Sequence, residues 1–111
     1  MRLQVKGRNL EISDSIRGYA EQKLGKLTKQ LPAEVQVELE LAVEKNPSIR
    51  ANQVAEATIF TKGHPLRARG ATSDMRASID ALTDKLTREL KTYREKRRQE
   101  PRRRTVQQEG Q

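Results

Sequence analysis

The sequence predicts an α+β domain of two layers, in which a mixed four-stranded sheet carries two helices on one face. Two observations point to this fold. Apolar and polar residues alternate over residues 34–44, which indicates a strand with one buried face. Apolar residues recur every three or four positions over 16–31 and 75–93, which is typical of helices with one buried side. The order strand, helix, three strands, helix fits one two-layer domain.

The first strand and helix come from the N-terminal third of the chain. Residues alternate between apolar and polar over about 2–7, which predicts a short strand. Ser13 is suited to cap a helix because its hydroxyl can accept a backbone hydrogen bond. Asp14 would complement the dipole of the same helix. A helix is therefore expected from about 14 to 30, ending before Pro32.

Three further strands follow this helix. The 34–44 strand has aliphatic residues on its inward side and mostly glutamates on the other. A second strand is expected at about 53–62 and a third over Leu66–Ala71, joined by a turn that contains glycine and proline. A right-handed crossover through the helix would place the first strand parallel to the 34–44 strand. Arg67 and Arg69 face outward and are expected to pair with outward acids across the sheet.

A long helix is expected to begin at Ser73 or Asp74, either of which can cap it. Its apolar stripe ends at Tyr93, and Pro101 opposes further helix, so the helix is expected to end at about 98. The residues that follow have nothing to bury and are expected to be disordered. The chain therefore divides into a folded domain and a disordered basic tail or linker start, at residues 1–98 and 99–111.

Charge is the strongest indication of a partner. The chain has 23 lysines and arginines against 15 acidic residues, and seven of the basic residues lie within 94–111. A polyanion is the first candidate, and solubility alone is the alternative. The last helix lacks the Trp or Phe of membrane-surface helices, so no membrane partner is expected. Phe60 stands alone on an acidic sheet face, which favours recognition of RNA phosphates and shape over base reading.

The residue types present give little support to catalysis. His64 is the single histidine and lies in a turn, where it is interpreted as an ordinary polar residue. The chain has no cysteine, and its row of glutamates is explained as a solvated strand face. We therefore expect no enzyme activity, no cofactor, no metal and no small-molecule substrate. No apolar run is long enough to span a membrane, which favours the cytoplasm.

Basic side chains gather on the outer surfaces of both predicted helices. If both helices cover one sheet face, these surfaces form one basic wall that can neutralise phosphates. Asp80 and Asp84 interrupt the wall early in the last helix, and its later turns are basic. The cations of this wall are Lys23, Lys26, Lys29, Lys85, Arg88, Lys91 and Arg98, with Arg94 and Lys96 on the two flanks of the last helix.

Three stretches of the sequence resemble one known family. These are Gly7–Ile12 followed by Arg17, then Lys23–Leu27, and then Asp74-Met75, Ala77-Ser78-Ile79-Asp80, Asp84-Lys85-Leu86, Arg88 and Leu90. Over about residues 2–98 the chain resembles the bacterial ribosome hibernation promoting factors, also called ribosome-associated inhibitors or sigma-54 modulation proteins. It departs from the family pattern at Arg76, where an aromatic is usual, and at Thr61, where a larger apolar residue is common.

The resemblance implies a fold similar to that of double-stranded RNA-binding domains. It also implies a site on the small ribosomal subunit, in the channel used by messenger and transfer RNA, where occupancy blocks translation in stationary phase or stress. The implied partners are 16S-type ribosomal RNA and neighbouring ribosomal proteins, bound by a monomeric domain. By position, the resemblance assigns RNA contacts to Lys23, Lys26, Lys85, Arg88 and Lys91. Charge geometry adds Lys29, Arg76 and Arg94.

A second function stays open at this point, namely a protein–protein regulator of the sigma-54 modulation type that does not act through RNA. The sequence also leaves open whether the chain is a complete short form or the N-terminal part of a long form. Long family members continue through a linker into a second, dimerising domain, so pairing of ribosomes is equally undecided.

Overall fold

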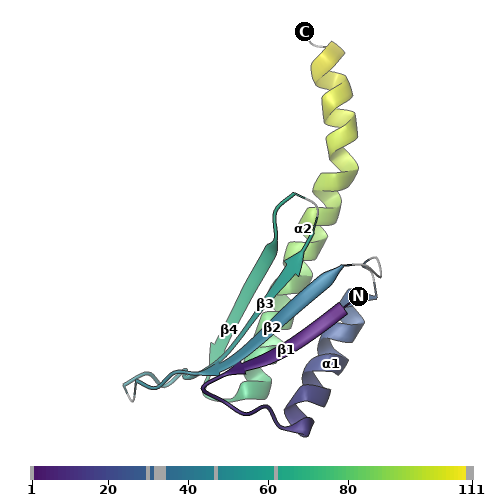
Figure 1. Ribbon diagram of the computed structural model, residues 1–111. Coiled ribbons are helices and arrows are strands. Elements are labelled where there is room, and N and C mark those ends of the chain that lie inside the picture. The colour runs from purple at the N-terminus through teal and green to yellow at the C-terminus, as the bar shows by residue number, and fades with distance from the viewer. Residues whose placement is uncertain (1, 30, 32–34, 47, 62, 110–111) are drawn as a thin grey trace.

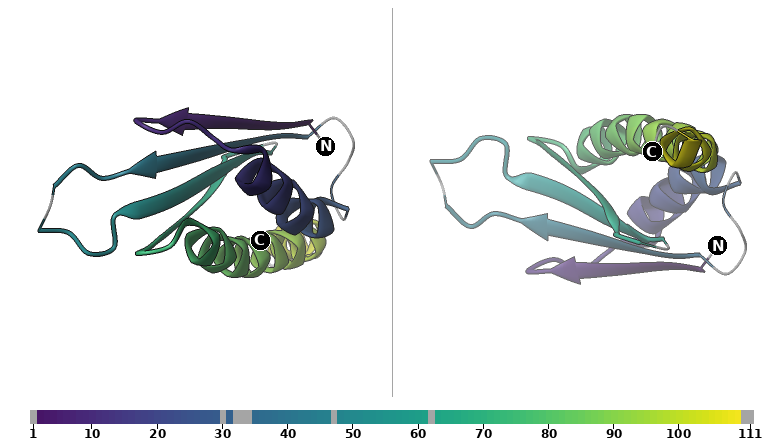
Figure 2. Two further views of the ribbon diagram at one scale, coloured as in Figure 1. Left: turned by 90° about the horizontal axis from the view of Figure 1, so that it is seen from below. Right: turned by 90° about the horizontal axis from the view of Figure 1, so that it is seen from above.

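The computed structural model describes residues 2–29, 31, 35–46, 48–61 and 63–109, with side chains as far as Glu95 except that of Thr28. The elements are β1 (Arg2–Arg8), α1 (Asp14–Thr28), β2 (Gln36–Val43), β3 (Gln53–Phe60), β4 (Leu66–Thr72) and α2 (Met75–Glu109) (Figure 1). The sheet order is β1-β2-β3-β4, and both helices cover the same face (Figure 2). The predicted α+β fold is confirmed.

Strand pairing follows the predicted mixed pattern. β1 is parallel to β2, whereas β2, β3 and β4 are antiparallel neighbours. The register sets Val37 opposite Ile59 and Leu39 opposite Ala57, so that aliphatic residues of adjacent strands share the inner face. A slip of one residue would turn all of them to solvent, which is why the alternation of β2 specifies the register so strongly.

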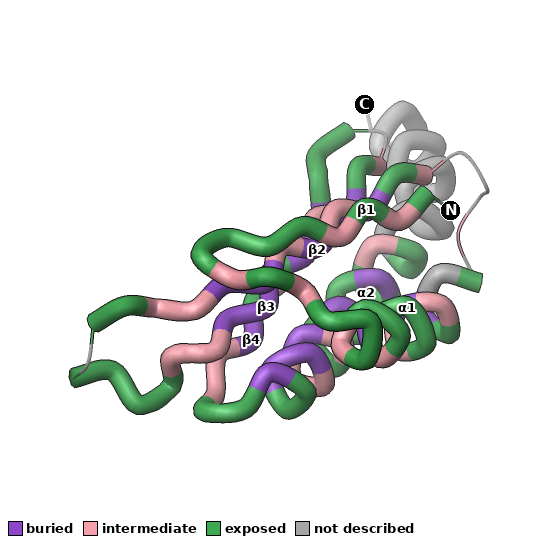
Figure 3. The backbone as a smooth tube through the Cα atoms, turned by 60° about the horizontal axis from the view of Figure 1, so that its bottom comes forward, coloured by how far each residue is buried: buried purple, intermediate pink, exposed green. Residues whose placement is uncertain are grey.

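The core lies between the sheet and the two helices, where Figure 3 shows the buried segments facing one another. It is built almost wholly from aliphatic side chains, as the scarcity of aromatic residues in the sequence requires. The largest of its fully buried members are Leu24, Leu39, Leu41, Ile59, Ile79, Leu82, Leu86 and Leu90. Burial of this apolar surface is the main stabilising contribution to the fold.

α2 packs unusually closely on β4 at Gly70. A Cβ atom at this position would collide with the backbone carbonyl oxygen of Ser78 and would lie 2.8 Å from the backbone nitrogen of Leu82. Because both obstacles are backbone atoms, no rotation of a side chain can relieve them. The glycine therefore sets the distance between α2 and the sheet.

The start of α2 is fixed by a hydrogen-bond network. Asp74, one of the two expected caps, accepts a hydrogen bond from the Ala77 backbone N–H through Oδ2 at 3.0 Å. The fully buried Ser78 hydroxyl donates to the Gln53 carbonyl at 2.6 Å and accepts from the Thr72 N–H at 3.0 Å. The first turn of α2 is thereby attached to both β3 and β4.

α2 extends further than the sequence predicted. It continues through Pro101 to Glu109, so the expected helix end at about 98 is wrong, and residues 99–109 are helical where disorder was expected. A proline removes one backbone donor from a helix, while the Glu, Arg and Gln residues around it have favourable helix propensity. The last two residues of the expected tail lie outside the described part of the chain, and its division from the domain stays a prediction.

Candidate nucleic-acid interface

α1 and α2 begin at the same end of the sheet and run side by side, which brings their basic residues onto one layer (Figures 1 and 2). The expected cap of α1 is confirmed, because the Ser13 hydroxyl accepts a hydrogen bond from the Ile16 N–H at 3.2 Å. Asp14 lies in the first turn of the same helix, where a negative charge is favourable. The two helix starts therefore form one end of the layer, which we call the closed end.

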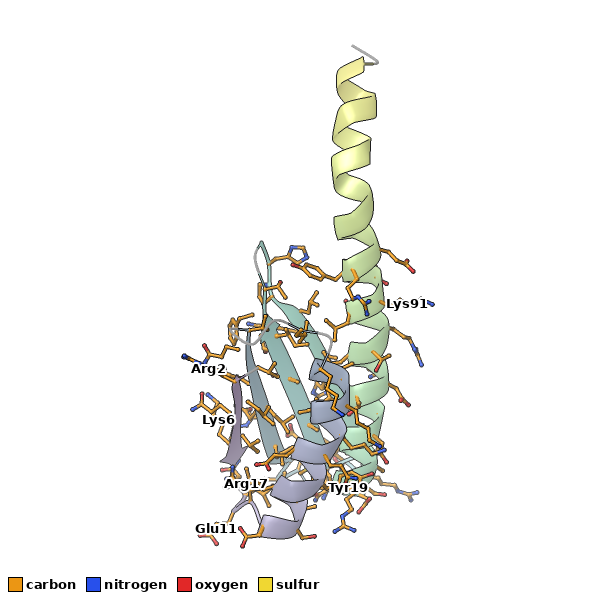
Figure 4. The ribbon with its side chains drawn as sticks, turned by 90° about the vertical axis from the view of Figure 1, so that its right-hand side faces the viewer. Arg2, Lys6, Glu11, Arg17, Tyr19 and Lys91 are labelled. Carbon is orange, nitrogen blue, oxygen red and sulfur yellow. The ribbon has the colours of Figure 1, made fainter. Side chains whose placement is uncertain are left out.

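A polar cluster joins the two helices at the closed end. The Tyr19 hydroxyl donates a hydrogen bond of 2.6 Å to Asp80 Oδ1, and Lys23 Nζ lies 3.4 Å from the same oxygen. Arg76 donates through Nη2 to the Ser15 hydroxyl at 2.6 Å. We call Ser15, Tyr19, Lys23, Arg76 and Asp80 the seam cluster, and Figure 4 labels its central residue, Tyr19. Two residues that were expected to contact RNA, Lys23 and Arg76, thus have partners within the chain.

The ring of Tyr19 is the centre of the seam cluster. Lys23 Nζ lies 5.7 Å and Arg76 Cζ 5.5 Å from its centroid, within the range of cation–π attraction. The hydrogen bond to Asp80 is the largest cause that raises the pKa of Tyr19, because it stabilises the neutral hydroxyl. The pKa of Lys23 is raised chiefly by its own hydrogen bond and attraction to the same carboxylate. Each of these contacts favours the geometry that joins α1 to α2.

Four other cations lie farther along the layer from the helix starts, at the last turn of α1 and near the middle of α2, in a region that we call the open end. They are exposed, and no hydrogen bond or ion pair holds their side chains within the part of the chain that the structure describes. Figure 4 shows one of them, Lys91, pointing away from the sheet. We call Lys26, Lys29, Arg88 and Lys91 the open cations. Arg94 is also exposed and lies almost one turn beyond Lys91.

Lys85 takes a third position. Its ammonium group donates a hydrogen bond of 2.7 Å to the Arg69 carbonyl oxygen, which attaches α2 to β4 on the side away from α1. The predicted RNA-binding residues therefore do not form one uniform wall. Lys23 and Arg76 belong to the seam cluster, Lys85 lies against the sheet, and the four open cations project at the open end, with Arg94 exposed beyond them. Contact of any of these residues with RNA stays a prediction.

The open face of the sheet carries the acids that the alternation predicted. The register sets Glu40 of β2 beside Lys6 of β1 and Glu56 of β3, and it sets Glu56 beside Arg69 of β4. Arg8 Nε lies 3.4 Å from Glu40 Oε1, so the first strand supplies an ion pair on this face. The expected register holds for Arg69, which lies opposite Glu56, but Arg67 lies opposite Thr58. Among the described residues, the ion pair on this face is formed by Arg8 of β1.

A small-molecule pocket, a metal site, a membrane span and a catalytic histidine have weaker support than the basic helix surface. A cavity of about 170 Å³ lies where the connection from β1 to α1 meets α1, β3 and α2, and it is lined by Leu10, Glu11, Ile12, Ser13, Ile16, Gln53 and Met75. The described residues contain no group of three or more His, Asp or Glu that could hold a metal ion. Across those same ranges, no helix is both long and apolar enough to cross a membrane. His64 is exposed, and its carbonyl accepts a hydrogen bond from the Thr61 hydroxyl.

Reasoning from the sequence missed Tyr19 and did not anticipate that Asp80 would hold a lysine. A partial signal was present, because Tyr19 and Lys23 are four residues apart, as are Arg76 and Asp80. Residues at this spacing share one side of a helix. The spacing says nothing about which helix lies beside that side, so the cluster could be recognised only once the two helices had been placed together.

Comparison with known proteins identifies relatives over most of the chain. The family model described as Sigma 54 modulation protein / S30EA ribosomal protein matches residues 3–98. A ribosome hibernation promotion factor of Picosynechococcus sp. is 36% identical over 97 residues, which are 86% of this chain and 50% of the relative. The ribosome hibernation promoting factor of Escherichia coli K12 is 33% identical over 99 residues, which are 89% of this chain and 99% of the relative.

The lengths of the relatives differ. The chain spans about half the length of the Picosynechococcus protein and of a Lactococcus lactis relative, for which the share is 54%. It matches nearly all of the Escherichia coli protein. The match thus covers whole proteins in some relatives and one part of longer proteins in others.

Solved structures show the same fold. A ribosomal subunit interface protein from Coxiella burnetii superimposes with a TM-score of 0.70 at 24% identity, over 85% of this chain and 98% of the other. The N-terminal domain of Protein Y from Thermus thermophilus superimposes with a TM-score of 0.68 at 30% identity, over 84% and 99%. Together with the family model over residues 3–98, these relatives show that the chain belongs to the Sigma 54 modulation protein / S30EA ribosomal protein family.

Proposed function

We propose that the protein is a cytoplasmic ribosome hibernation factor. It binds the small ribosomal subunit in the channel for messenger and transfer RNA and inhibits translation in stationary phase or stress. Its partners there are 16S-type ribosomal RNA and neighbouring ribosomal proteins. Support comes from the names of relatives that match 86–89% of this chain and from the family match over residues 3–98.

One structural observation carries the proposal, namely the open cations. Lys26, Lys29, Arg88 and Lys91 are exposed on the helical layer, whereas on the opposite face glutamates of β2 and β3 lie beside cations of β1 and β4. Exposed cations at one end of a helical layer can neutralise several RNA phosphates at once, with release of the counterions that had screened them. The sheet face, where acids and cations alternate, would then point away from RNA or toward a protein.

The mechanism that fits this charge distribution is steric occlusion. The domain would occupy space that messenger and transfer RNA need, and its affinity would come largely from contacts with phosphates. Such an inhibitor acts stoichiometrically and has no turnover, so it needs no nucleophile, acid–base pair or metal. Its association with the ribosome would be fast, and its affinity would fall as the ionic strength rises, because the rate and the affinity both depend on long-range electrostatic attraction.

The first test is the salt dependence of binding to purified small subunits. If about four phosphates are neutralised, the affinity should fall on the order of 100-fold between 50 and 200 mM salt. Sedimentation with the subunits at several salt concentrations measures this change. An affinity that stays flat across this range would contradict the electrostatic mechanism.

A pair of triple variants with equal loss of charge locates the site. Lys26→Gln/Arg88→Gln/Lys91→Gln should reduce subunit affinity at least 30-fold and make the salt dependence shallower, since each lost phosphate contact lowers the slope by about 0.9. The matched control, Arg2→Gln/Lys6→Gln/Arg67→Gln, removes three exposed cations from the sheet strands and should change affinity less than threefold. Equal losses in the two variants would move the site away from the helices.

A protein partner is the second candidate, because the family description itself includes modulation of sigma-54. The row formed by Glu38 and Glu40, with Glu56 on the neighbouring strand, gives that partner an acidic surface to recognise. Pull-down from a lysate with and without ribonuclease separates the two functions. Loss of the captured ribosomal proteins on ribonuclease treatment supports binding through RNA, and retention of a non-ribosomal protein supports the alternative.

A further inference from the structure

The seam cluster places two cations beside a carboxylate at a surface that a phosphate can reach. The side chains of Lys23 and Asp80 keep 39% and 44% of their exposure. They are therefore not buried structural groups, and a polyanion that approaches the closed end meets both. An RNA phosphate would have to compete with Asp80 for Lys23, at a site where the carboxylate already lies 3.4 Å away.

We propose that Asp80 is a specificity-determining residue, which withholds Lys23 from generic polyanions and so confines their binding to the open cations. This inference rests on the proposed function, because it concerns how the same RNA-binding layer chooses its partner. A layer with every cation free would bind any double-stranded RNA through its phosphates. A layer whose closed end is neutralised binds generic RNA more weakly. Its affinity then depends more on how well the phosphates of the partner RNA match the positions of the open cations.

Tyr19 makes this arrangement more than a chance surface ion pair. Its hydroxyl donates to the same Asp80 oxygen that attracts Lys23, which restricts the rotation of the carboxylate. Its ring also lies beneath the ammonium group of Lys23 and the guanidinium group of Arg76. Release of Lys23 to a phosphate therefore breaks an ion pair and a cation–π contact together, whereas an ordinary exposed lysine loses neither.

A neighbouring carboxylate adds to the effect. Asp84 lies one turn beyond Asp80 on α2, and its charge also raises the pKa of Lys23. Arg76 in turn has its own acceptor, the Ser15 hydroxyl at 2.6 Å. Lys23 and Arg76 at the closed end are thus matched by Asp80 and Asp84, so a phosphate there finds little net positive charge.

The test removes the carboxylate and keeps its shape. Asp80→Asn leaves an amide oxygen that can accept the Tyr19 hydrogen bond, while the charge that holds Lys23 is lost. Its affinity for a mixed-sequence RNA duplex, measured by fluorescence anisotropy, should rise about three- to fivefold, which is the range of an exposed ion pair. The salt slope should steepen by about 0.9, as one more phosphate is neutralised. Affinity for small subunits should rise less, so the preference for subunits over duplex falls.

Two further variants separate the local effect from net charge. Glu56→Gln makes the same change in net charge on the open sheet face, away from Lys23, and should leave duplex affinity within about 1.5-fold of the wild type. In Lys23→Gln/Asp80→Asn the added salt slope should disappear, since the released cation is gone. Equal gains in Asp80→Asn and Glu56→Gln would overturn the proposal.

Two other outcomes are decisive. If Lys23→Gln alone weakens duplex binding several-fold, Lys23 already contacts RNA in the wild type and the proposal is wrong. If Asp80→Asn raises subunit and duplex affinity by the same factor, Asp80 limits binding but not specificity, and the proposal is again wrong. Failure of the wild type to bind small subunits would reject the proposed function instead. The duplex measurements do not depend on that result, so the two failures remain distinguishable.

Discussion

The closed and open ends of the helical layer carry the same residue types but use them differently. At the closed end, Lys23 and Arg76 are held by Asp80, Ser15 and the ring of Tyr19. At the open end, the open cations project without such partners among the described residues. The difference shows that a basic helix surface is not a binding surface along its whole length. Its neighbours decide which cations are available to a ligand.

The two ends also differ in their polar contacts with the sheet. α2 approaches β4 closely at Gly70 and is connected to β3 and β4 through Ser78. The helix then continues to Glu109, well beyond Tyr93, the last residue of its apolar stripe. We therefore expect substitutions at the closed end to change stability and those at the open end to change binding.

The largest effect on stability is expected from Gly70→Ala. The new methyl group would meet backbone atoms of Ser78 and Leu82, so α2 must move away from β4. Overpacking of this kind lowers the free energy of unfolding by about 2–3 kcal/mol. Urea denaturation measures the loss, and subunit affinity of the folded variant should stay within twofold of the wild type. Unchanged stability would mean that α2 can move away from β4 without lowering the free energy of unfolding.

A smaller effect of opposite sign is expected from Gly18→Ala. Gly18 lies in α1 on an exposed surface, and a Cβ atom there would have no atom within 4 Å besides its chain neighbours and the backbone of its own helix. Alanine should raise the free energy of unfolding by about 0.5–1 kcal/mol, because it restricts the unfolded chain and favours helix. The same denaturation experiment measures the gain. If the variant were more stable but bound subunits poorly, RNA would approach α1 at the closed end, and the separation of the two ends would fail.

The smallest effect concerns alkaline pH. The pKa values of Tyr19 and Lys23 are both raised, mainly by hydrogen bonds to Asp80. A group with a raised pKa stabilises the fold below its unfolded value, about 10 for these two, and that contribution is lost as the pH rises through the folded value. The stability difference between wild type and Tyr19→Phe should therefore be constant near neutral pH and shrink above about pH 10. A stability difference that increased above about pH 10 would contradict the assigned role of the hydrogen bond between Tyr19 and Asp80.

The sequence predicted the fold well because the fold depends on local patterns. The alternation of β2 and the apolar stripe of α2 each determine which side of an element is buried, independently of any partner. Gly70 and Ser78 were not recognised as structural residues, although both lie on the inner side of their elements. Their roles depend on the distance between α2 and the sheet, which no local pattern specifies.

The candidate site was less predictable, for the same physical reason. Charge and helical spacing place Lys23, Lys85 and Lys91 on helix surfaces equally well. They do not show that Lys23 pairs with Asp80, that Lys85 donates a hydrogen bond to the carbonyl of Arg69, or that Lys91 points away from the sheet. The predicted end of α2, at about residue 98, was wrong because it gave more weight to the helix-breaking effect of Pro101 than to the helix propensity of the residues around it.

The parallel pairing of β1 with β2 has a consequence for the order of folding. β2, β3, β4 and α2 are joined by connections between sequence neighbours, so they can assemble early. β1 leaves the ribosome first during synthesis, yet it has no strand to pair with until β2 has emerged, and α1 must fold between them. We expect β1 to be the last strand protected during refolding, which pulsed hydrogen exchange would detect. Of the four strands, β1 would thus be synthesised first and would pair last.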